Sequence, residues 1–419
     1  MPKIDNLTIG TLEFSLHWNS EDARHVDRLH AHKVNFWRDA FPGSLRAALE
    51  GAGAGRRCRL ELPQWASLPD AAAALVRSLP RDALTGLVFA GQTLTRRAPE
   101  IRPGRFYPRG RIRGLPKVYD VGDLRPALVL GLDEEHVRLD LNHPLAGREL
   151  TMEALVLDVR PKHGDTGGVA HDWLDEACAE GPGMQAPHSL GENLAPDYGH
   201  GDCDGAFSRQ DEAPDAEFYA CPRLVDHLDA LALHGLAEML AARIAPGMRV
   251  LDLMASRDSH LPDELEIQVT GLGMNAEELA ANPRLADQAH KQVVHDLNAE
   301  PKLPFADASF DAVLLSLSVE YLTNPRAVLA EAARVLVPGG RILVSFSDRY
   351  FPTKAVRLWT ELHSFERLGL VLSLLRETGA FADLATETLR GRPRPWNDPH
   401  AHELRCSDPL FLAEAARKA

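Results

Sequence analysis

The chain has 419 residues, of which 45% are hydrophobic and 25% charged, and its formal net charge is −14. This length predicts two or three domains, and the acidic balance argues against nucleic acid or an anionic membrane as the main partner. The sequence has no apolar run long enough to cross a bilayer and no signal-peptide core, so we expect a cytoplasmic protein.

The first part of the chain alternates between strand-like and turn-like segments. TIGTLEFSL (8–16) predicts a strand, FPGSLRAALEGAGAG (41–55) a short amphipathic helix closed by glycines, and 58–62 a further strand. VRLDLNHPLAGRELTMEALVLDV (137–159) then places an NHPLAG turn between two strand-like segments. These segments resemble the SlyD-like FKBP-type peptidyl-prolyl isomerases. The resemblance implies an antiparallel domain over 1–162, closed by a hairpin at NHPLAG, with an inserted peptide-binding flap at about 66–136.

The resemblance also implies that prolyl isomerisation would need an aromatic-lined pocket. Four aromatic residues could line one: Trp18, Phe36, Trp37 and Phe41. The family's tyrosine and Phe-Asp pair are not matched in residues 16–41, so the sequence leaves isomerase activity open.

Two groups of residues could supply metal ligands. His25, His30 and His32 lie close together, but the interleaved acids favour a solvated helix face. The second group matches no common zinc spacing and is interpreted as separate thiols: Cys178, His200, Cys203 and Cys221. We therefore predict no metal site.

Residues 163–217 are rich in acids, glycine and proline and predict a solvated connector. Helical spacing then returns over 211–240, carried by Leu224, Val225, Leu228, Leu231 and Leu236. This segment predicts a helical cap on the next domain. Either it covers substrate, with Phe218, Tyr219 and Arg223 nearby, or it only packs.

From residue 250 onward strands and helices alternate, which predicts a doubly wound parallel sheet with a ligand at the carboxyl ends of its strands. Residues 303–346 contain LPFADASFD, an acidic-aromatic pair and RVLVPGG in that order. This order resembles the class I S-adenosylmethionine-dependent methyltransferases, type 11 group. The resemblance implies a Rossmann-like domain over 218–390 with S-adenosyl-L-methionine as cofactor, followed by a C-terminal tail at 391–419.

Carried over to this sequence, the resemblance implies a cofactor site at four strand ends. Asp252 ends the first strand, and Met254, Ala255 and Ser256 stand where the family has a glycine-rich turn. Gly273 replaces the ribose-binding acid, for which Asn275 could be a neutral substitute. The remaining candidates are Asp296 for the adenine amino group, Leu297 for the adenine ring and Ser316 beneath the sulfonium.

Polar residues after the fourth and fifth strands are candidates for the acceptor site. Arg349, Tyr350 and Lys354 would bind an anionic or polar substrate, although the same segment could simply cap a helix. His260, Glu320 and Tyr321 are predicted at the same rim, with Glu320 or His260 as general base. Methyl transfer depends mainly on alignment, so it requires no obligatory catalytic side chain.

The preferred hypothesis is a multidomain enzyme that methylates a polypeptide or a small molecule, with no nucleic-acid or membrane partner. One alternative is a chaperone-like binding protein with a degenerate methyltransferase fold. Another is a protein whose main activity is prolyl isomerisation. The missing turn glycines and Gly273 favour the first alternative, whereas Asp252 and Asp296 favour the enzyme.

Overall fold

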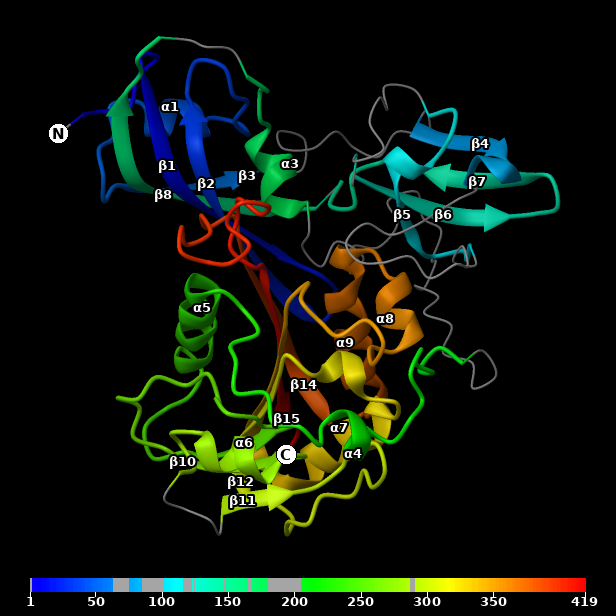
Figure 1. Cartoon of the computed structure of the whole chain (residues 1–419). Helices are drawn as coiled ribbons and strands as arrows, with labels where there is room; N and C mark the ends of the chain where they lie inside the picture. The colour runs from blue at the N-terminus through cyan, green and yellow to red at the C-terminus, as the bar shows by residue number, and fades with distance from the viewer. Residues whose placement is uncertain are drawn as a thin grey trace. The chain divides into compact units, whose positions relative to one another are not determined.

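The structure is a computed structural model (Figure 1) that describes residues 2–62, 75–84, 101–115, 123, 125–146, 148–164, 168–179, 205–286 and 291–419. The chain forms two compact units. Unit 1 comprises Met1–Ala206 and Thr360–Gly369, and unit 2 comprises Phe207–Trp359 and Leu370–Ala419. Among the described residues, no helix has the length and apolarity needed to cross a membrane.

The larger sheet of unit 1 is antiparallel, in the order β2-β1-β8-β3. Its strands are β1 (Thr8–Asn19), β2 (Ala23–Asn35), β3 (Arg57–Leu62) and β8 (Leu150–Pro161). The helices α1 (Leu45–Leu49) and α3 (Trp173–Cys178) pack on it, with the Trp173 and Phe14 ring centroids 5.5 Å apart. The strand predicted at 8–16, the short helix and the strand at 58–62 are thus confirmed.

A second antiparallel sheet of unit 1 is formed by chain that lies between β3 and β8 in the sequence, in the order β4-β7-β6-β5. Its strands are β4 (Val76–Pro80), β5 (Phe106–Pro108), β6 (Pro126–Leu132) and β7 (His136–Asp140). Short 3-10 turns, Arg81–Leu84 and Arg109–Arg111, flank these strands. The sheet has its own core, which includes Tyr107, Val129 and Leu139.

The hairpin predicted over 137–159 is wrong. β7 pairs with β6 and β4, whereas β8 pairs with β1 and β3, so the chain around NHPLAG connects two different sheets. The twelve residues of β8 find both of their neighbours in the larger sheet. Sequence alternation identifies strands but not their partners.

The excursion Thr360–Gly369 belongs to unit 1 through a buried ion pair. The Arg105 Nε donates to Glu366 at 3.1 Å, and the Phe106 N–H donates to the same carboxylate at 3.0 Å. Because removal of one partner leaves a buried charge uncompensated, this pair holds the excursion firmly.

The predicted helix face around His25 is instead the strand β2. His25 and Asp27 are buried, His30 is half-buried and His32 is exposed, in keeping with a period of two rather than 3.6. Within the described ranges no group of three or more His, Cys, Asp or Glu residues is placed to hold a metal ion. His200 and Cys203 lie outside those ranges.

The four aromatic residues predicted to line an isomerase pocket do not meet. Trp18 stacks on His25 at one end of the β1-β2 ladder, with centroids 4.0 Å apart. Phe36 stacks on Phe41 beyond the other end, roughly 30 Å away at the rise of an extended strand. Trp37 is 59% exposed.

Unit 2 contains the predicted parallel sheet. The order is β11-β10-β9-β12-β13-β15-β14, parallel from β11 to β13 and antiparallel beyond. The strands are β9 (Arg249–Leu253), β10 (Gln268–Gly273), β11 (Gln292–Val294), β12 (Phe310–Ser316), β13 (Leu336–Phe346), β14 (Phe381–Arg390) and β15 (Leu410–Arg417). The segment 391–419, described above as a tail, therefore supplies a strand between β13 and β14.

Helices cover both faces of this sheet. They are α4 (Asp215–Phe218), α5 (Ala230–Ala241), α6 (Ala276–Ala281), α7 (Pro325–Val335), α8 (Arg357–Glu361) and α9 (Arg367–Glu377), with a 3-10 turn at Val319–Tyr321. The end of α8, the 3-10 turn Ser364–Glu366 and the start of α9 fall within residues 360–369 and so belong to unit 1. Figure 1 shows α5 and α9 on opposite sides of β14 and β15. The consecutive residues Val313, Leu314 and Leu315 of β12 are all fully buried, as expected for a sheet covered on both faces.

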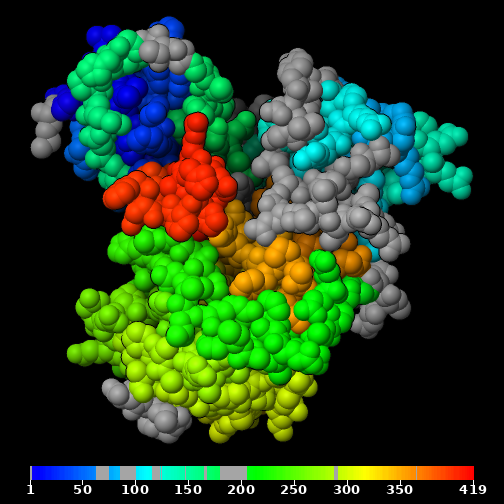
Figure 2. All heavy atoms as spheres, in the orientation of Figure 1, coloured from blue at the N-terminus to red at the C-terminus, as the bar shows by residue number. Residues whose placement is uncertain are grey.

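The continuous helix predicted over 211–240 is wrong. The chain forms α4 and α5 with an irregular stretch at 219–229, part of the surface of unit 2 (green in Figure 2). Pro222 disfavours a helical conformation in the preceding residue, and Asp229 caps α5 by accepting from the Leu231 and Ala232 N–H groups. Leu224 and Val225, counted as helix core, are 53% and 57% exposed.

The connection from β9 to β10, residues 254–267, contains no helix. Parallel strands are usually joined by a helical crossover, and a helix N-terminus would normally face the ligand there. Met254 and His260 both have φ of +56°, which bends the chain without glycine.

Candidate functional site

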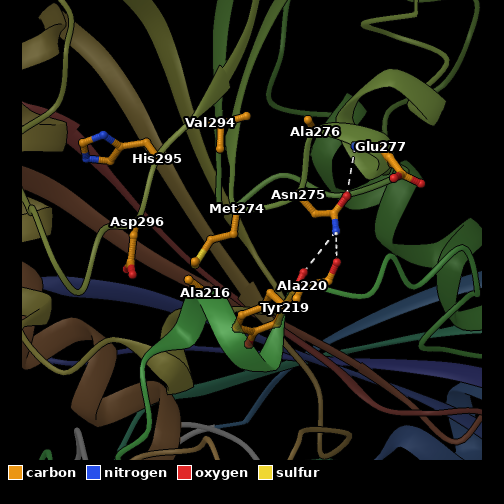
Figure 3. Close-up of a pocket in the computed structure, with 10 residues that line it drawn as sticks. All are labelled: Ala216, Tyr219, Ala220, Met274, Asn275, Ala276, Glu277, Val294, His295 and Asp296. Atoms are coloured by element: carbon orange, nitrogen blue, oxygen red, sulfur yellow. Dashed lines mark hydrogen bonds between the residues drawn. The ribbon is translucent and has the colours of Figure 1, made fainter.

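A pocket of ≈ 470 Å³ lies at the carboxyl ends of β10 and β11 (Figure 3). Three segments contribute to it: α4 with the residues after it, the turn after β10, and the end of β11. Its lining residues are Ala216, Tyr219, Ala220, Met274, Asn275, Ala276, Glu277, Val294, His295 and Asp296. This is the edge at which a doubly wound sheet binds ligands.

Asp296 lies in this pocket with one carboxylate oxygen engaged. Its Oδ1 accepts from the N–H groups of Asn298 at 2.9 Å and Ala299 at 3.2 Å. Within the described part of the chain, its Oδ2 has no hydrogen-bond partner. The turn thus orients a carboxylate that can still accept from a ligand donor, while the neighbouring Leu297 is 3% exposed and belongs to the core.

Asn275 also lines the pocket, but its carboxamide is already used by the protein. Its Oδ1 caps α6 by accepting from the Glu277 N–H at 2.9 Å, and its Nδ2 donates to the Tyr219 carbonyl at 3.0 Å (Figure 3). The sequence suggested that Asn275 could substitute for the missing ribose carboxylate. In this conformation its carboxamide is not available for that role.

Gly273 has a steric explanation that the sequence did not reveal. A Cβ at this position would lie 2.0 Å from the Ala255 carbonyl oxygen, because the turn after β9 continues along β10 with the Ala255 N–H donating to the Leu272 carbonyl at 2.8 Å. No acidic side chain fits at 273 beside this turn. The absence of turn glycines after β9 and the absence of an acid at position 273 therefore have the same structural cause, the path of the turn beside β10.

The turn is held by α6 and by its C-cap residue, Asn282. The Ser256 hydroxyl donates to Glu278 at 2.6 Å, and the Asn282 Nδ2 donates to the Ser256 carbonyl at 2.9 Å and to the Ser259 hydroxyl at 3.0 Å. Arg257 pairs with Asp226 at 3.0 Å. The side chains of Ser256 and Arg257 thus serve the protein itself.

Asp252 is the most perturbed carboxyl group of the site. It is 3% exposed, and burial raises its pKa to about 7 despite a hydrogen bond from Ser259. Its Oδ2 lacks a hydrogen-bond partner among the described residues, as do the buried hydroxyls of Ser316 and Ser345, which are register neighbours on β12 and β13. Buried polar atoms are nearly always satisfied, so this row of unpaired atoms across adjacent strand ends indicates a ligand site.

The three predicted catalytic residues have different environments. Burial lowers the pKa of His260, which lies 3.7 Å from Asp258 and remains a neutral imidazole at pH 7. Glu320 is 1% exposed, and its charge contributes to raising the pKa of Tyr321 well above its usual value, although burial is the larger cause. The Tyr321 hydroxyl accepts from the Phe351 N–H at 2.9 Å, so Tyr321 holds the backbone of the rim at Phe351.

Lys354 is not at the rim, contrary to the prediction. Its side chain is fully buried, its Nζ donates to the Ala213 carbonyl at 2.7 Å, and it lies 3.2 Å from both Asp211 and Asp215. Arg349 and Tyr350 are half-buried, with the Arg349 Nη2 3.3 Å from the His400 Nε2. Arg349 and Tyr350 therefore remain the candidates for substrate binding.

Three aromatic rings that the sequence patterns did not reveal lie around Arg223, and we name this group the aromatic box. The Arg223 guanidinium carbon lies 4.4 Å from the Phe218 centroid, 5.4 Å from that of Tyr219 and 5.3 Å from that of Phe351. Phe218 and Phe351 are 133 residues apart, so the sequence does not show that their rings meet. The sequence signals for the box are two clusters of aromatic residues with arginine, FYACPR and RYF.

Comparison with known proteins identifies a domain in unit 2. Residues 256–344 match the family described as Methyltransferase domain. The chain is 38% identical over 117 residues to a demethylmenaquinone methyltransferase of Mycobacterium bovis, covering 28% of this chain and 47% of that protein. It is 32% identical over 161 residues to the ubiquinone/menaquinone biosynthesis C-methyltransferase UbiE of Laribacter hongkongensis, covering 36% and 64%.

Solved structures with related folds include the [4+2]-cyclase SpnF, at 18% identity and a TM-score of 0.32 over 48% of this chain and 91% of that one. A second is phosphoethanolamine N-methyltransferase 2 of Haemonchus contortus, at 14% identity and a TM-score of 0.31 over 45% and 53%.

Residues 256–344 thus match a methyltransferase domain, and S-adenosylmethionine, the predicted cofactor, is confirmed. It spans between about half and two thirds of the length of the curated relatives named above.

Proposed function

We propose that this chain transfers the methyl group of S-adenosylmethionine to an acceptor at the carboxyl edge of the unit 2 sheet. The observation that carries the proposal is the row of buried, unpaired atoms on Asp252, Ser316 and Ser345, on strands of the same parallel sheet whose carboxyl edge holds the pocket with Asp296. Buried polar atoms without partners lower the stability of the fold, and a bound cofactor would offset this cost by pairing with them.

The residues present fit the cofactor at both of its ends. Asp296 would accept from the adenine amino group, and Asp252 would face the methionine ammonium. When bound, the cofactor supplies an electrophilic methyl group on a sulfonium. The residues of the protein contribute by aligning the acceptor with the methyl group of the cofactor and by excluding water from the site.

Glu320 is the proposed general base for an acceptor that must lose a proton. It lies in a buried environment beside Tyr219 and Tyr321, whose pKa values its charge helps to raise. The names of the relatives suggest a quinone-like acceptor, and the polypeptide acceptor predicted from the sequence is the other candidate.

Thermal unfolding with S-adenosylmethionine and S-adenosylhomocysteine tests the proposal. At a hundredfold excess over the Kd, binding should add about 2.7 kcal/mol to the free energy of unfolding of unit 2. Asp296→Asn should reduce this shift, whereas Asp263→Asn, which alters an exposed turn residue, should not. No shift at millimolar ligand would instead favour a binding protein with a degenerate methyltransferase fold.

For unit 1 we propose an FKBP-like region that binds polypeptide. The support is an antiparallel sheet with the short helix α1 and a separate sheet inserted between β3 and β8. The separation of Trp18 from Phe36 argues for peptide binding over isomerisation. In a proline-limited refolding assay the protein should suppress aggregation but leave the slow phase of tens of seconds unchanged; acceleration of that phase would restore the isomerase hypothesis.

A further inference from the structure

The aromatic box adjoins the cofactor pocket. Tyr219 is shared: it lines the pocket and forms one wall of the box. Phe218 lies edge-on to both Tyr219 and Phe351, with centroids 4.9 Å and 5.6 Å apart. All three rings belong to unit 2, and the Tyr321 hydroxyl holds the backbone of Phe351 in place.

The box already contains a cation, and rings rather than acids surround it. The Arg223 Nη2 donates to the Phe218 carbonyl at 2.9 Å, while its Nη1 is buried and has no hydrogen-bond partner among the described residues. Among the described residues no carboxylate forms an ion pair with Arg223, which is half-buried. A guanidinium nitrogen that is buried is ordinarily held by a carboxylate, so the ring faces supply the stabilisation here.

A second cation near the box is neutralised. The Lys354 Nζ lies 5.3 Å from the Phe218 centroid, but Asp211 and Asp215 balance its charge. The buried Glu320 interacts electrostatically with Tyr219, so the surroundings of the box favour positive charge.

Arg223 is placed where its side chain can leave the box. It lies in the irregular stretch 219–229, so its departure breaks no helix, and its own backbone N–H is anchored independently by Glu278 at 2.7 Å. Its neighbours Leu224 and Val225 contribute little to the core, being more than half exposed.

We propose that the aromatic box is the part of the acceptor site that binds a cationic group, an alkylammonium or a guanidinium, and that Arg223 fills it when no acceptor is bound. Aromatic cages of this kind recognise quaternary ammonium and guanidinium groups. The aromatic box binds the charged group of the acceptor, and a different atom of the acceptor receives the methyl group. The role of the box in acceptor binding rests on the proposed methyl transfer. The binding of a cation to the box can be measured independently of methyl transfer.

The test uses choline and its uncharged isostere dimethylbutanol, in which carbon replaces the quaternary nitrogen, as calorimetric probes of the full-length chain. Arg223→Ala should bind choline about tenfold more tightly than wild type, because the competing guanidinium is gone, and about tenfold more tightly than it binds dimethylbutanol. Phe218→Leu in the Arg223→Ala background should abolish the gain. Arg223→Gln, which is the milder change, repeats the measurement should the alanine variant unfold.

Arg326→Ala is the matched control, because Arg326 lies over the single ring of Phe207 at 5.5 Å and pairs with Glu377. It should show no gain. Equal binding of choline and dimethylbutanol would overturn the proposal in favour of an apolar slot suited to a quinone-like ring, as would a gain that survives Phe218→Leu. Thermal unfolding of the same variants with S-adenosylhomocysteine measures cofactor binding separately. A failure of the methyltransferase proposal can therefore be distinguished from a failure of the aromatic-box proposal.

Discussion

Gly273 and Ala255 show how one backbone contact alters a cofactor site. The carbonyl oxygen of Ala255 occupies the space that any side chain at 273 would need. A ribose-binding acid at the end of β10 is therefore incompatible with the turn that this chain uses, whatever the hydrogen bonds it would have offered.

Gly273→Ala should lower the free energy of unfolding by about 2–4 kcal/mol, since the Cβ meets backbone that cannot rotate away. Gly271→Ala, on the same strand, meets the end of the flexible Leu285 side chain and should cost about 1 kcal/mol. Urea denaturation of both variants makes the comparison. Equal losses would show that the turn moves easily.

Asp252 should make stability depend on pH. Its pKa is about 7 when folded and about 3.9 when unfolded, so the folded state binds the extra proton between these values. Its contribution is fully present below about pH 4 and is lost as pH rises to about 7, by an amount on the order of 4 kcal/mol. Asp252→Asn should match wild type near pH 4 and be more stable at pH 8. A difference between the two that does not vary with pH would contradict this account.

At the scale of elements, the β9-β10 connection dispenses with a crossover helix and is held by α6 and Asn282. The Asn282 carboxamide is fully buried and joins two points of the turn. The turn, which elsewhere would be shaped by glycine and a helix N-terminus, is here shaped by side-chain hydrogen bonds.

Asn282→Ala should therefore cost about 1–3 kcal/mol by leaving the Ser256 carbonyl and the Ser259 hydroxyl unsatisfied. Because Ser259 also donates to Asp252, the variant should weaken S-adenosylhomocysteine binding in calorimetry. Asn397→Ala, at an exposed turn position, is the control. Normal binding by a destabilised Asn282→Ala would mean that the turn does not contact the cofactor.

At the scale of the whole molecule, two compact units carry separate proposed activities. Unit 1 is built from two antiparallel sheets and unit 2 from a mostly parallel one. The boundary at residues 206 and 207 lies in the connector predicted at 163–217, whereas the exchange of residues 360–369 between units was not foreseen.

Hydrogen exchange should show this division. S-adenosylhomocysteine should increase amide protection around residues 252–256, 273–277 and 294–299 of unit 2, which form the site. The strands β1, β2 and β8 of unit 1 should be unaffected. Protection gained equally in both units would indicate that the cofactor acts on the chain as a whole.

The sequence by itself determined the parallel sheet of unit 2, its similarity to a methyltransferase domain, its cofactor, and the positions of Asp252 and Asp296, because period, order and strand-end chemistry are local properties of the chain. The paired strands of β2 around His25, the burial of Lys354, the break before Asp229, the fit of Gly273 against Ala255 and the ring walls around Arg223 were decided only by the tertiary structure. Each of these depends on a contact between residues distant in the chain, and a pattern along one segment carries no information about which distant atoms will fill the space beside it.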